Sequence, residues 1–490
     1  MEANKRQFII SDKPEDLFNN PQIIQFKDFY LTADNLLEVT TKSSETIQLI
    51  LIGFLLSYKK PNNSNTDILE EILADSNTFN DVVSRLKHYS GRWALIYISN
   101  DEVKIINDIV GARQVYYYYS DNKVFCASQP HIVAKISNQA LSIEKSILDY
   151  YQAAAFSNSE CAWIGDETRY ENIFHLLPNK YFNLLDGKVT RFWPLDTIKK
   201  QDLNSASSKI ANILKNIMYA ANCRYDLSIP ISAGWDSRVL LSASKEIIHD
   251  CYCFIQKYGE MNYQHPDIYV PKKLSNTLNF NFTVHNAVNY DSEFDSAIMK
   301  SVDIAQSNDK KILCYNFYES LKGKLNISGV VGELNRSRYG KNRPVSAKGL
   351  VDYFGRSDSI YAIRQAEKWL KEIQKSDIDI EQINLWDLFY WEQYIGNWGT
   401  SFQATLDISN EELFPFNCRE IVETSYGLNE LPYNNSPLFI GVINELWPEV
   451  LTEPVNPLSF KGKIIKTIKK TLRKMGIFNH IKNVFYYIKK

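Results

Sequence analysis

The chain has 490 residues, of which 44% are hydrophobic, 13% aromatic and 23% charged, a composition typical of folded proteins with a large core. Its formal net charge of −2 excludes a general electrostatic attraction to nucleic acid, so we expect no nucleic-acid partner. The seven cysteines are scattered and form no Cys-x-x-Cys pair. This spacing argues against a structural zinc site and is typical of reduced cysteines in a cytosolic protein.

Neither secretion nor a membrane span is expected from the sequence. The N-terminal segment lacks the basic start and apolar run of a signal peptide. The most apolar stretch, residues 47–56, is about half of the roughly 20 residues that cross a bilayer, so a buried strand or helix segment explains it better. We therefore expect a cytoplasmic protein.

Residues 1–195 are predicted to form an α+β domain of layered sheets with helices. Short apolar or alternating runs, separated by turn signals, predict strands, and two patterns with helical spacing interrupt them. An Asp-Gly dipeptide at 186–187 predicts a closing hairpin. The predicted strands cover residues 23–29, 93–98, 103–106, 115–119 and 124–127, and the helical patterns cover 68–73 and 82–86.

A polar stretch at 196–208 is the best candidate for a linker, and the pattern changes after it. Apolar residues recur at helical spacing from Ile210 to Met218, and helices then alternate with apolar strands, which predicts a parallel α/β sheet. Beyond residue 350 the chain is predicted to be mainly helical. We assign this second domain to residues 205–460. Its predicted strands are 227–231, 251–255 and 280–285.

The last segment, residues 461–490, contains ten Lys and Arg residues and neither Asp nor Glu. Apolar residues are interleaved with them, so the segment is a basic amphipathic tail. One interpretation is that this tail binds an anionic membrane surface, which would be the inner face of the cell membrane. The alternative is a solvated helical tail that packs on the slightly acidic body of the same chain.

The segment from Ser228 to Leu241 is predicted to be a buried strand, a tight loop at 232–237 and a helix. Backbone N–H groups at a helix start are unpaired and attract anions, and small loop residues let phosphate oxygens approach them. Asp236 would repel a bare phosphate, so its place in such a site is that of a ligand for the accompanying Mg²⁺. The alternative is an ordinary strand–turn–helix junction with Asp236 or Ser237 as the N-cap.

The loop sequence at 232–237, Ser-Ala-Gly-Trp-Asp-Ser, resembles the SGGxDS pyrophosphate loop of the asparagine synthetase-like ATP pyrophosphatases, with Ala233 in place of the first glycine. Residues 327–333, followed by 339–340, are similar to the second nucleotide loop of that family. Residues 414–419 resemble its later proline–phenylalanine segment, which packs under the site.

The first half of the chain resembles the glutamine amidotransferase-type domain that is joined to these synthetases. The similar segments are 90–95, 107–113 with the tyrosines that follow, and 191–194 at the end of the domain. The family nucleophile is a Cys directly after the initiator Met, and this position is Glu2 here. We therefore expect no glutaminase activity and a structural domain, as in the β-lactam-synthetase-like branch.

The resemblance implies ATP and Mg²⁺ as cofactors. It implies that Asp236 and Glu333 share the Mg²⁺ and that Glu333 serves catalysis. Lys461 is the candidate for the family's catalytic lysine, although it also fits the basic tail, and residues 453–460 contain no lysine at the expected place. Val330 stands where the family often has a carboxylate. The candidate nucleotide-binding residues are Ser232, Ala233, Gly234, Asp236, Ser237, Arg238, Ser328 and Gly329.

The function that these residues imply is an ATP-dependent ligase. It would adenylate a small-molecule or glycan carboxylate, release pyrophosphate, and form an amide with ammonia or an amine. Similarity to synthetase-like proteins of bacterial surface-polysaccharide pathways suggests a sugar acid as substrate. The alternative is a degenerate synthetase homologue that binds nucleotide or acts as a membrane-associated scaffold. Asp267 is expected to contact the substrate or to cap the next helix.

Overall fold

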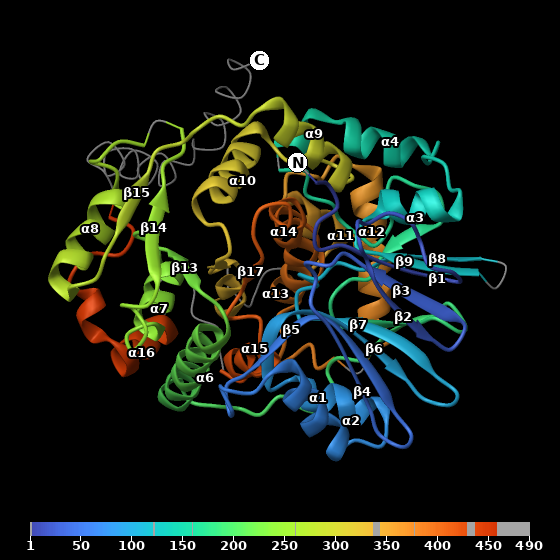
Figure 1. The fold of residues 1–490 in the computed structure, drawn as a ribbon, viewed down its shortest axis with the longest axis horizontal. Coiled ribbons are helices and arrows are strands. Elements are labelled where there is room, and N and C mark those ends of the chain that lie inside the picture. The colour runs from blue at the N-terminus through green and yellow to red at the C-terminus, as the bar shows by residue number, and fades with distance from the viewer. Residues whose placement is uncertain are drawn as a thin grey trace.

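The computed structural model describes residues 2–120, 123–158, 160–259, 261–336, 344–376, 378–428 and 437–457. Lys461, the tail at 461–490 and residues 339–340 lie outside these ranges. Figure 1 shows two antiparallel sheets built by the first part of the chain, a parallel sheet on the other side of the molecule, and helices between them. The fold is therefore mixed, with antiparallel sheets followed by a parallel α/β sheet.

The first part of the chain forms two six-stranded sheets that pack face to face. Phe8 and Ile10 of one sheet share an apolar core with Ile50 and Ile52 of the other. The first sheet has the order β10-β8-β9-β1-β3-β2 and the second β12-β11-β7-β6-β5-β4. The strands of the first sheet are β1 (Phe8–Ser11), β2 (Gln22–Phe26), β3 (Phe29–Ala33), β8 (Tyr116–Ser120), β9 (Lys123–Ala127) and β10 (Ile173–His175). Those of the second are β4 (Val39–Ser43), β5 (Gln48–Ser57), β6 (Tyr89–Ile98), β7 (Val103–Asn107), β11 (Lys180–Asn183) and β12 (Val189–Arg191).

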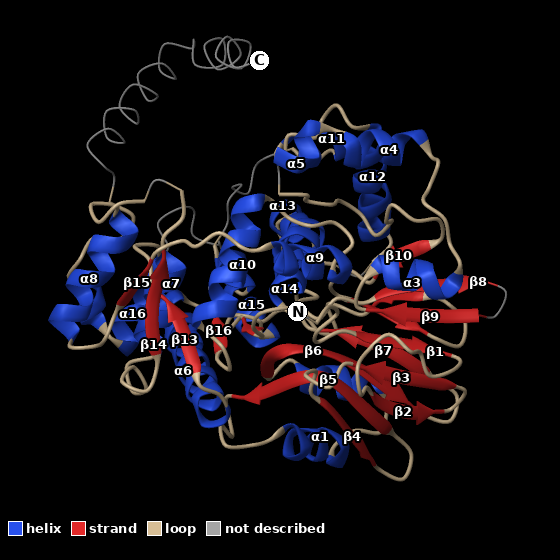
Figure 2. Cartoon of the chain, turned by 45° about the horizontal axis from the view of Figure 1, so that its top comes forward, coloured by secondary structure: helices blue, strands red, loops and turns tan. Residues whose placement is uncertain are grey.

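Helices cover the outer faces of both sheets, so this part has four layers (Figure 2). The helices α1 (Asn65–Ala74) and α2 (Phe79–Leu86) pack on the second sheet, and α3 (Pro130–Ser137) packs on the first. Strand β5 is buried on both faces because its alternate side chains enter two different cores. This explains why the run at 47–56 is almost entirely apolar, with Gln48 as its polar exception, and it shows that the run is a strand and not a helix.

The predicted strand at 23–29 is wrong in one respect, because the chain turns back inside it. Strands β2 and β3 pair as a hairpin in which Phe26 lies opposite Phe29. Lys27 adopts a positive φ of 45° in the turn. Lysine rarely takes this conformation. The turn also lacks the Gly or Asn that would have indicated it in the sequence.

The second sheet system is parallel and has the order β15-β14-β13-β16-β17. Its strands are β13 (Leu227–Pro230), β14 (Tyr252–Gln256), β15 (Thr283–His285), β16 (Leu325–Ile327) and β17 (Glu412–Leu413). The helices around it include α6 (Leu203–Arg224), α7 (Trp235–Ala243), α8 (Pro266–Leu278), α9 (Ser292–Ser301), α10 (Asn308–Ser320), α15 (Arg419–Tyr426) and α16 (Pro437–Leu446).

The predicted linker at 196–208 is partly helical. Helix α6 begins at Leu203, because the Asp202 side chain accepts hydrogen bonds from the N–H groups of Asn204 and Ser205 at 2.9 and 3.0 Å. An Asp N-cap of this kind starts a helix within a polar sequence. The remaining stretch that fits a linker is therefore 196–201.

The remaining helices are α4 (Lys145–Gln152), α5 (Ala154–Asn158), α11 (Ala347–Asp352), α12 (Ile360–Gln374), α13 (Leu385–Phe389), α14 (Thr400–Leu406), the π-helix η2 (Tyr390–Gly399), and the short 3₁₀ helices η1 (Val330–Asn335) and η3 (Pro448–Leu451). Of these, η3 packs on α7, α8 and α16 beside the parallel sheet. Among the described residues, no helix has both the length and the apolar composition that a bilayer span requires.

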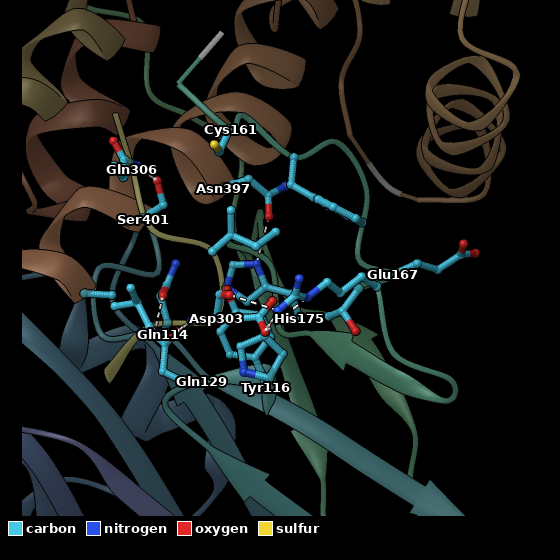
Figure 3. Close-up of a pocket in the computed structure, with 17 residues that line it drawn as sticks. Gln114, Tyr116, Gln129, Cys161, Glu167, His175, Asp303, Gln306, Asn397 and Ser401 are labelled. Carbon is cyan, nitrogen blue, oxygen red and sulfur yellow. Dashed lines mark hydrogen bonds and ion pairs between the residues drawn. The ribbon is translucent and has the colours of Figure 1, made fainter. Parts of the chain in front are cut away.

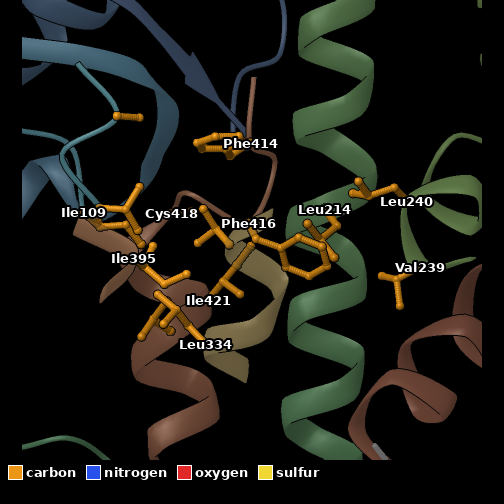
Figure 4. Close-up of a cluster of buried hydrophobic side chains, with 14 of the residues drawn as sticks. Ile109, Leu214, Val239, Leu240, Leu334, Ile395, Phe414, Phe416, Cys418 and Ile421 are labelled. Atoms are coloured by element: carbon orange, nitrogen blue, oxygen red, sulfur yellow. The ribbon is translucent and has the colours of Figure 1, made fainter. Parts of the chain in front are cut away.

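One apolar core crosses the predicted domain boundary (Figure 4). Ile109 of the first part packs in the same cluster as Leu214 of α6 and Ile395 of η2. The proline–phenylalanine segment contributes Phe414 and Phe416, both fully buried. The two parts are therefore packed together through side chains, so the domain limits at 195 and 205 remain a prediction.

A buried ion-pair cluster also joins the parts. Arg92 and Arg113, from the segments at 90–95 and 107–113, contact Asp407 and Glu411 near the end of the parallel sheet. The Arg92 guanidinium donates to both Asp407 carboxylate oxygens, at 2.5 and 2.8 Å, and Arg113 donates to Glu411. Both arginine side chains are almost fully buried. These motif residues of the first part thus hold the two parts together.

Candidate functional site

The candidate nucleotide loops meet at the point where the strand order of the parallel sheet reverses. Strand β13 pairs with β14 on one side and with β16 on the other, so the connections after β13 and β16 leave in opposite directions. In open parallel sheets, the crevice at such a switch point is the usual ligand site. The loop at 232–237 follows β13, and the second loop follows β16. The topology therefore brings together two segments that are about 95 residues apart in sequence.

The backbone of the first loop is held by side chains around it. The N–H of Ser232 donates to Ser237 Oγ at 2.8 Å, and the N–H of Gly234 donates to Ser232 Oγ at 3.1 Å. The N–H of Ala233 donates to Asp267 Oδ1 at 2.9 Å. The N-cap of α7 is Gly234 rather than Asp236 or Ser237. A phosphate bound here would take the places of these side-chain oxygens.

Asp236 lies in the first turn of α7, against the second loop. Its carboxylate pairs with Arg336 at 2.7 Å, and its Oδ1 is buried without a hydrogen-bond partner among the described residues. A Cβ on Gly332 would lie 2.5 Å from this oxygen, and one on Gly329 would lie 2.7 Å from the Asp236 Cβ. The two glycines therefore allow the second loop to close on Asp236.

The charged groups around Asp236 are a second carboxylate, Glu333, and the Arg336 guanidinium. The pKa of Asp236 is raised to about 6, chiefly by burial; Arg336 acts against this shift, and the charge of Glu333 adds to it. Glu333 Oε2 accepts a hydrogen bond from the Tyr390 hydroxyl. No group of three His, Cys, Asp or Glu side chains that would hold a metal occurs in the described ranges. Mg²⁺ needs no such cage, since one or two carboxylates plus phosphate oxygens and water suffice, and Asp236 and Glu333 are oxygen donors of the kind that it prefers.

Arg238 is placed differently from the sequence-based prediction. Its side chain is fully buried, and its guanidinium donates to the carbonyl groups of Val450, Glu453 and Pro454. Burial lowers its pKa to about 10. In this conformation the guanidinium ties the C-terminal segment to α7 and does not serve as a phosphate ligand. Sequence spacing places Arg238 on α7 but does not determine which side of the helix it faces.

The C-terminal segment passes directly beside the first loop. The N–H of Asn456 donates to the carbonyl of Ala233 at 2.8 Å. This contact brings the segment expected to carry the catalytic lysine next to the loop. Lys461 itself follows the last described residue, 457, so its assignment remains a prediction.

The second loop retains part of its expected composition. Ser328 directly follows β16, and its N–H donates to the carbonyl of Leu413 at 2.9 Å, which fixes the start of the loop. Val330 lies against η2, with its Cγ1 3.6 Å from the place of a Cβ on Gly399. An apolar contact with the π-helix therefore occupies the position where the family often has a carboxylate.

Sequence reasoning missed Arg336 and Tyr390, the partners of the two candidate magnesium ligands. It also left two roles open for Asp267, and the contact with the Ala233 N–H adds another. His265 is the residue that caps α8, because its Nδ1 accepts from the Asp267 N–H at 3.3 Å. The Asp267 carboxylate instead accepts a hydrogen bond from the first loop, and no local sequence pattern predicts this long-range contact.

A separate small cavity of about 80 Å³ lies between the first sheet and the central helices (Figure 3). Its wall includes His175 of β10, whose ring stacks on Tyr116 with centroids 4.5 Å apart. His175 Nδ1 lies 2.9 Å from Asn397 Oδ1, and Asn397 Nδ2 donates elsewhere, so Nδ1 carries the proton. His175 Nε2 is then an acceptor without a partner among the described residues.

We expect His175 to make stability fall as pH drops below 6.5. Burial lowers its pKa to about 4, so the unfolded chain binds a proton between pH 6.5 and 4 that the folded chain rejects. This difference of about 2.5 pKa units corresponds to about 3 kcal/mol, lost progressively over that window. Urea unfolding at pH 7.5 and 4.5 should therefore show a smaller pH effect for His175→Phe than for the natural sequence. The exposed His249, changed to Gln, is the control, and an equal pH effect in all three proteins would contradict the assignment.

No protein-family model and no curated protein matches the chain. Among solved structures, it is similar to a glutamine phosphoribosylpyrophosphate amidotransferase from B. subtilis complexed with ADP and GMP, at 8% identity over 68% of this chain and 71% of that chain, with a TM-score of 0.25. It is also similar to an allosteric regulatory enzyme of purine biosynthesis, at 9% identity over 72% and 73% of the two chains, again with a TM-score of 0.25. Similarity at this TM-score and identity does not indicate a function for the chain.

Proposed function

We propose that the chain is an ATP- and Mg²⁺-dependent ligase that forms an amide from a carboxylate and ammonia or an amine. The observation that carries this proposal is the closure of the second loop on Asp236 at the switch point of the parallel sheet. Gly329 and Gly332 approach the Asp236 side chain so closely that a Cβ at either place would clash, with the Asp236 Cβ and with its Oδ1 respectively. A buried carboxylate oxygen that lacks a hydrogen-bond partner among the described residues is the kind of group that a cation satisfies.

In the proposed reaction, a substrate carboxylate oxygen attacks the α-phosphorus of ATP, and the bond to the β-phosphate oxygen breaks. Pyrophosphate leaves, and the nitrogen nucleophile then displaces AMP from the acyl-adenylate and loses a proton. Bound Mg²⁺ would offset negative charge on the phosphates. Asp236 and Glu333 would hold it, while Ser232, Gly234 and Ser237 would bind phosphate oxygens at the start of α7.

Two parts of the proposal depend on residues outside the described ranges. Lys461 would stabilise the acyl-adenylate chemistry, and the tail at 461–490 would place the enzyme at an anionic membrane surface. The carboxylate would then be a small molecule or a glycan acid used at that surface.

A second candidate function is a nucleotide-binding or membrane-associated scaffold. One observation favours it: all three N–H groups from Ser232 to Gly234 already donate to side chains, so a phosphate must displace these contacts. The apolar Val330, at a position where the family often has a carboxylate, also favours the scaffold. A scaffold would bind nucleotide weakly or not at all and would release no pyrophosphate.

Pyrophosphate release from Mg-ATP distinguishes the two functions. The ligase should release pyrophosphate only when a suitable carboxylate is present, and Glu333→Gln should reduce that rate by about 100-fold, because a magnesium ligand is lost. The exposed Glu246, changed to Gln, should leave the rate unchanged. If no acid in a broad panel stimulates release above the rate of ATP alone, the scaffold is the better explanation.

A further inference from the structure

The starts of helices α7 and α8 lie close together at one edge of the parallel sheet. Strands β13 and β14 pair in parallel, and α7 and α8 follow them, so both helices begin beyond the carboxyl ends of neighbouring strands. The helices begin at Trp235 and Pro266. Each helix start carries unpaired N–H groups and the positive end of the helix dipole. The place between the two starts therefore favours an anion.

The carboxylate of Asp267 supplies a negative charge at this place. Asp267 lies in the first turn of α8, and its Oδ1 accepts a hydrogen bond from the Ala233 N–H, just before α7, at 2.9 Å. A backbone N–H at a helix start that donates to an anionic oxygen is the contact that a bound phosphate makes. In this conformation, Asp267 thus takes the place of a phosphate oxygen.

The N–H groups of the first loop donate to two kinds of partner. Those of Ser232 and Gly234 donate to the serine hydroxyls of Ser237 and Ser232. A hydroxyl carries its own proton, so it can rotate and donate to a phosphate oxygen. A carboxylate has no proton to donate and repels a phosphate. Of these three partners, Asp267 is therefore the one that must leave when a phosphate binds.

The surroundings of Asp267 allow its carboxylate to turn away. The side chain is 26% exposed, so water can solvate the charge after it leaves the loop. His265 Nδ1 lies 3.6 Å from the Asp267 carboxylate, but it accepts a hydrogen bond from the Asp267 N–H. This nitrogen therefore carries no proton, and the ring does not hold the carboxylate as a cation would.

We infer that Asp267 is an internal competitor of the nucleotide phosphates, an autoinhibitory contact that occupies the Ala233 N–H until Mg-ATP displaces it. The inference rests on the proposed function, because it assigns to Asp267 the control of that same phosphate site. The alternative is that Asp267 only braces the loop. The two roles predict opposite effects on binding when the charge is removed.

The test is calorimetric titration of Mg-pyrophosphate and of Mg-ATP into the full chain and into Asp267→Asn. Asparagine keeps the size of the side chain and removes its charge. We expect both probes to bind roughly tenfold more tightly to the variant, because a charge-assisted hydrogen bond and a charge repulsion no longer oppose them. A bracing role predicts weaker or unchanged binding, since the loop then loses support.

The matched control is Glu453→Gln, in the C-terminal segment that passes beside the same loop. The Glu453 side chain is 22% exposed, close to the value for Asp267, and it pairs with Lys273 of α8 at 3.7 Å. The loop N–H groups donate to other residues. This variant should bind both probes like the natural sequence. An equal gain in Glu453→Gln would show a general effect of nearby negative charge and would overturn the inference.

Thermal unfolding guards against effects on folding. Without added nucleotide, Asp267→Asn and Asp267→Ala should unfold at slightly lower temperatures than the natural sequence, because the contact with Ala233 is weakened or lost. With saturating Mg-pyrophosphate, the rise in the unfolding temperature should be larger for both variants. A rise no larger than that of the natural sequence, or equal or weaker binding by Asp267→Asn, contradicts the competitor role.

Failure of this inference is distinguishable from failure of the proposed function. If the natural sequence binds Mg-ATP and Asp267→Asn binds it no more tightly, the competitor role is wrong and the ligase stands. If Asp267→Asn binds Mg-pyrophosphate more tightly but no acid stimulates pyrophosphate release, the competitor role stands and the ligase is wrong. If none of the proteins binds either probe, the first loop is no phosphate site and both fail.

Discussion

Asp236→Ala is expected to abolish Mg-ATP binding that calorimetric titration detects for the natural sequence. The variant removes the carboxylate around which both loops close, and with it the negative charge that offsets Mg²⁺. We expect affinity to fall by at least about 100-fold, equivalent to about 2.8 kcal/mol. The isosteric Asp236→Asn should lose nearly as much, because the charge and not the volume holds the cation.

The control is Asp250→Ala, at an exposed carboxylate beyond the end of α7. It should bind Mg-ATP like the natural sequence. If Asp236→Ala binds equally well, Asp236 is no magnesium ligand. If the natural sequence does not bind either, the loop at 232–237 is a structural junction and the ligase proposal fails.

Asp407→Ala is expected to lower the free energy of unfolding by about 3–5 kcal/mol, the loss typical of breaking a buried ion pair. Arg92 then remains buried without the carboxylate to which it donates two hydrogen bonds. Arg113 retains Glu411, so the cluster is weakened and not dissolved. Urea unfolding followed by circular dichroism measures the change.

The matched control is Asp149→Ala, which breaks an ion pair with Lys145 on the surface of α4. Its carboxylate is 62% exposed, and exposed pairs contribute about 0–1 kcal/mol. A loss below 1 kcal/mol for Asp407→Ala would show that the buried cluster does not hold the two parts together.

The strands and helices of this chain follow well from local sequence. The apolar runs predict β7, β8 and β9 within one residue of their limits and the second half of β6, and the helical patterns predict α1 and α2. The strand–loop–helix order around 232–237 also holds, but α7 begins at Trp235, so the second half of the predicted loop is the first turn of the helix. These features depend on neighbouring residues, whose periodicity is visible in a single sequence.

The candidate site was only partly predictable. The prediction names Asp236 and Glu333, and the structure brings their segments together. The sequence-based prediction does not include the pairing of Arg336 with Asp236, or the contact of Arg238 with the C-terminal segment. Side-chain direction on a helix depends on what packs against it, and that packing involves residues more than 200 positions away.

By itself, the sequence determined the succession of antiparallel and parallel sheet segments, the small residues of the first loop, and the carboxylates near both loops. The tertiary structure decided that the two loops adjoin and that Asp267 holds the Ala233 N–H. The physical reason is the range of the interactions. Periodicity and turn chemistry act over a few residues, whereas strand order and burial in a shared core place distant residues side by side.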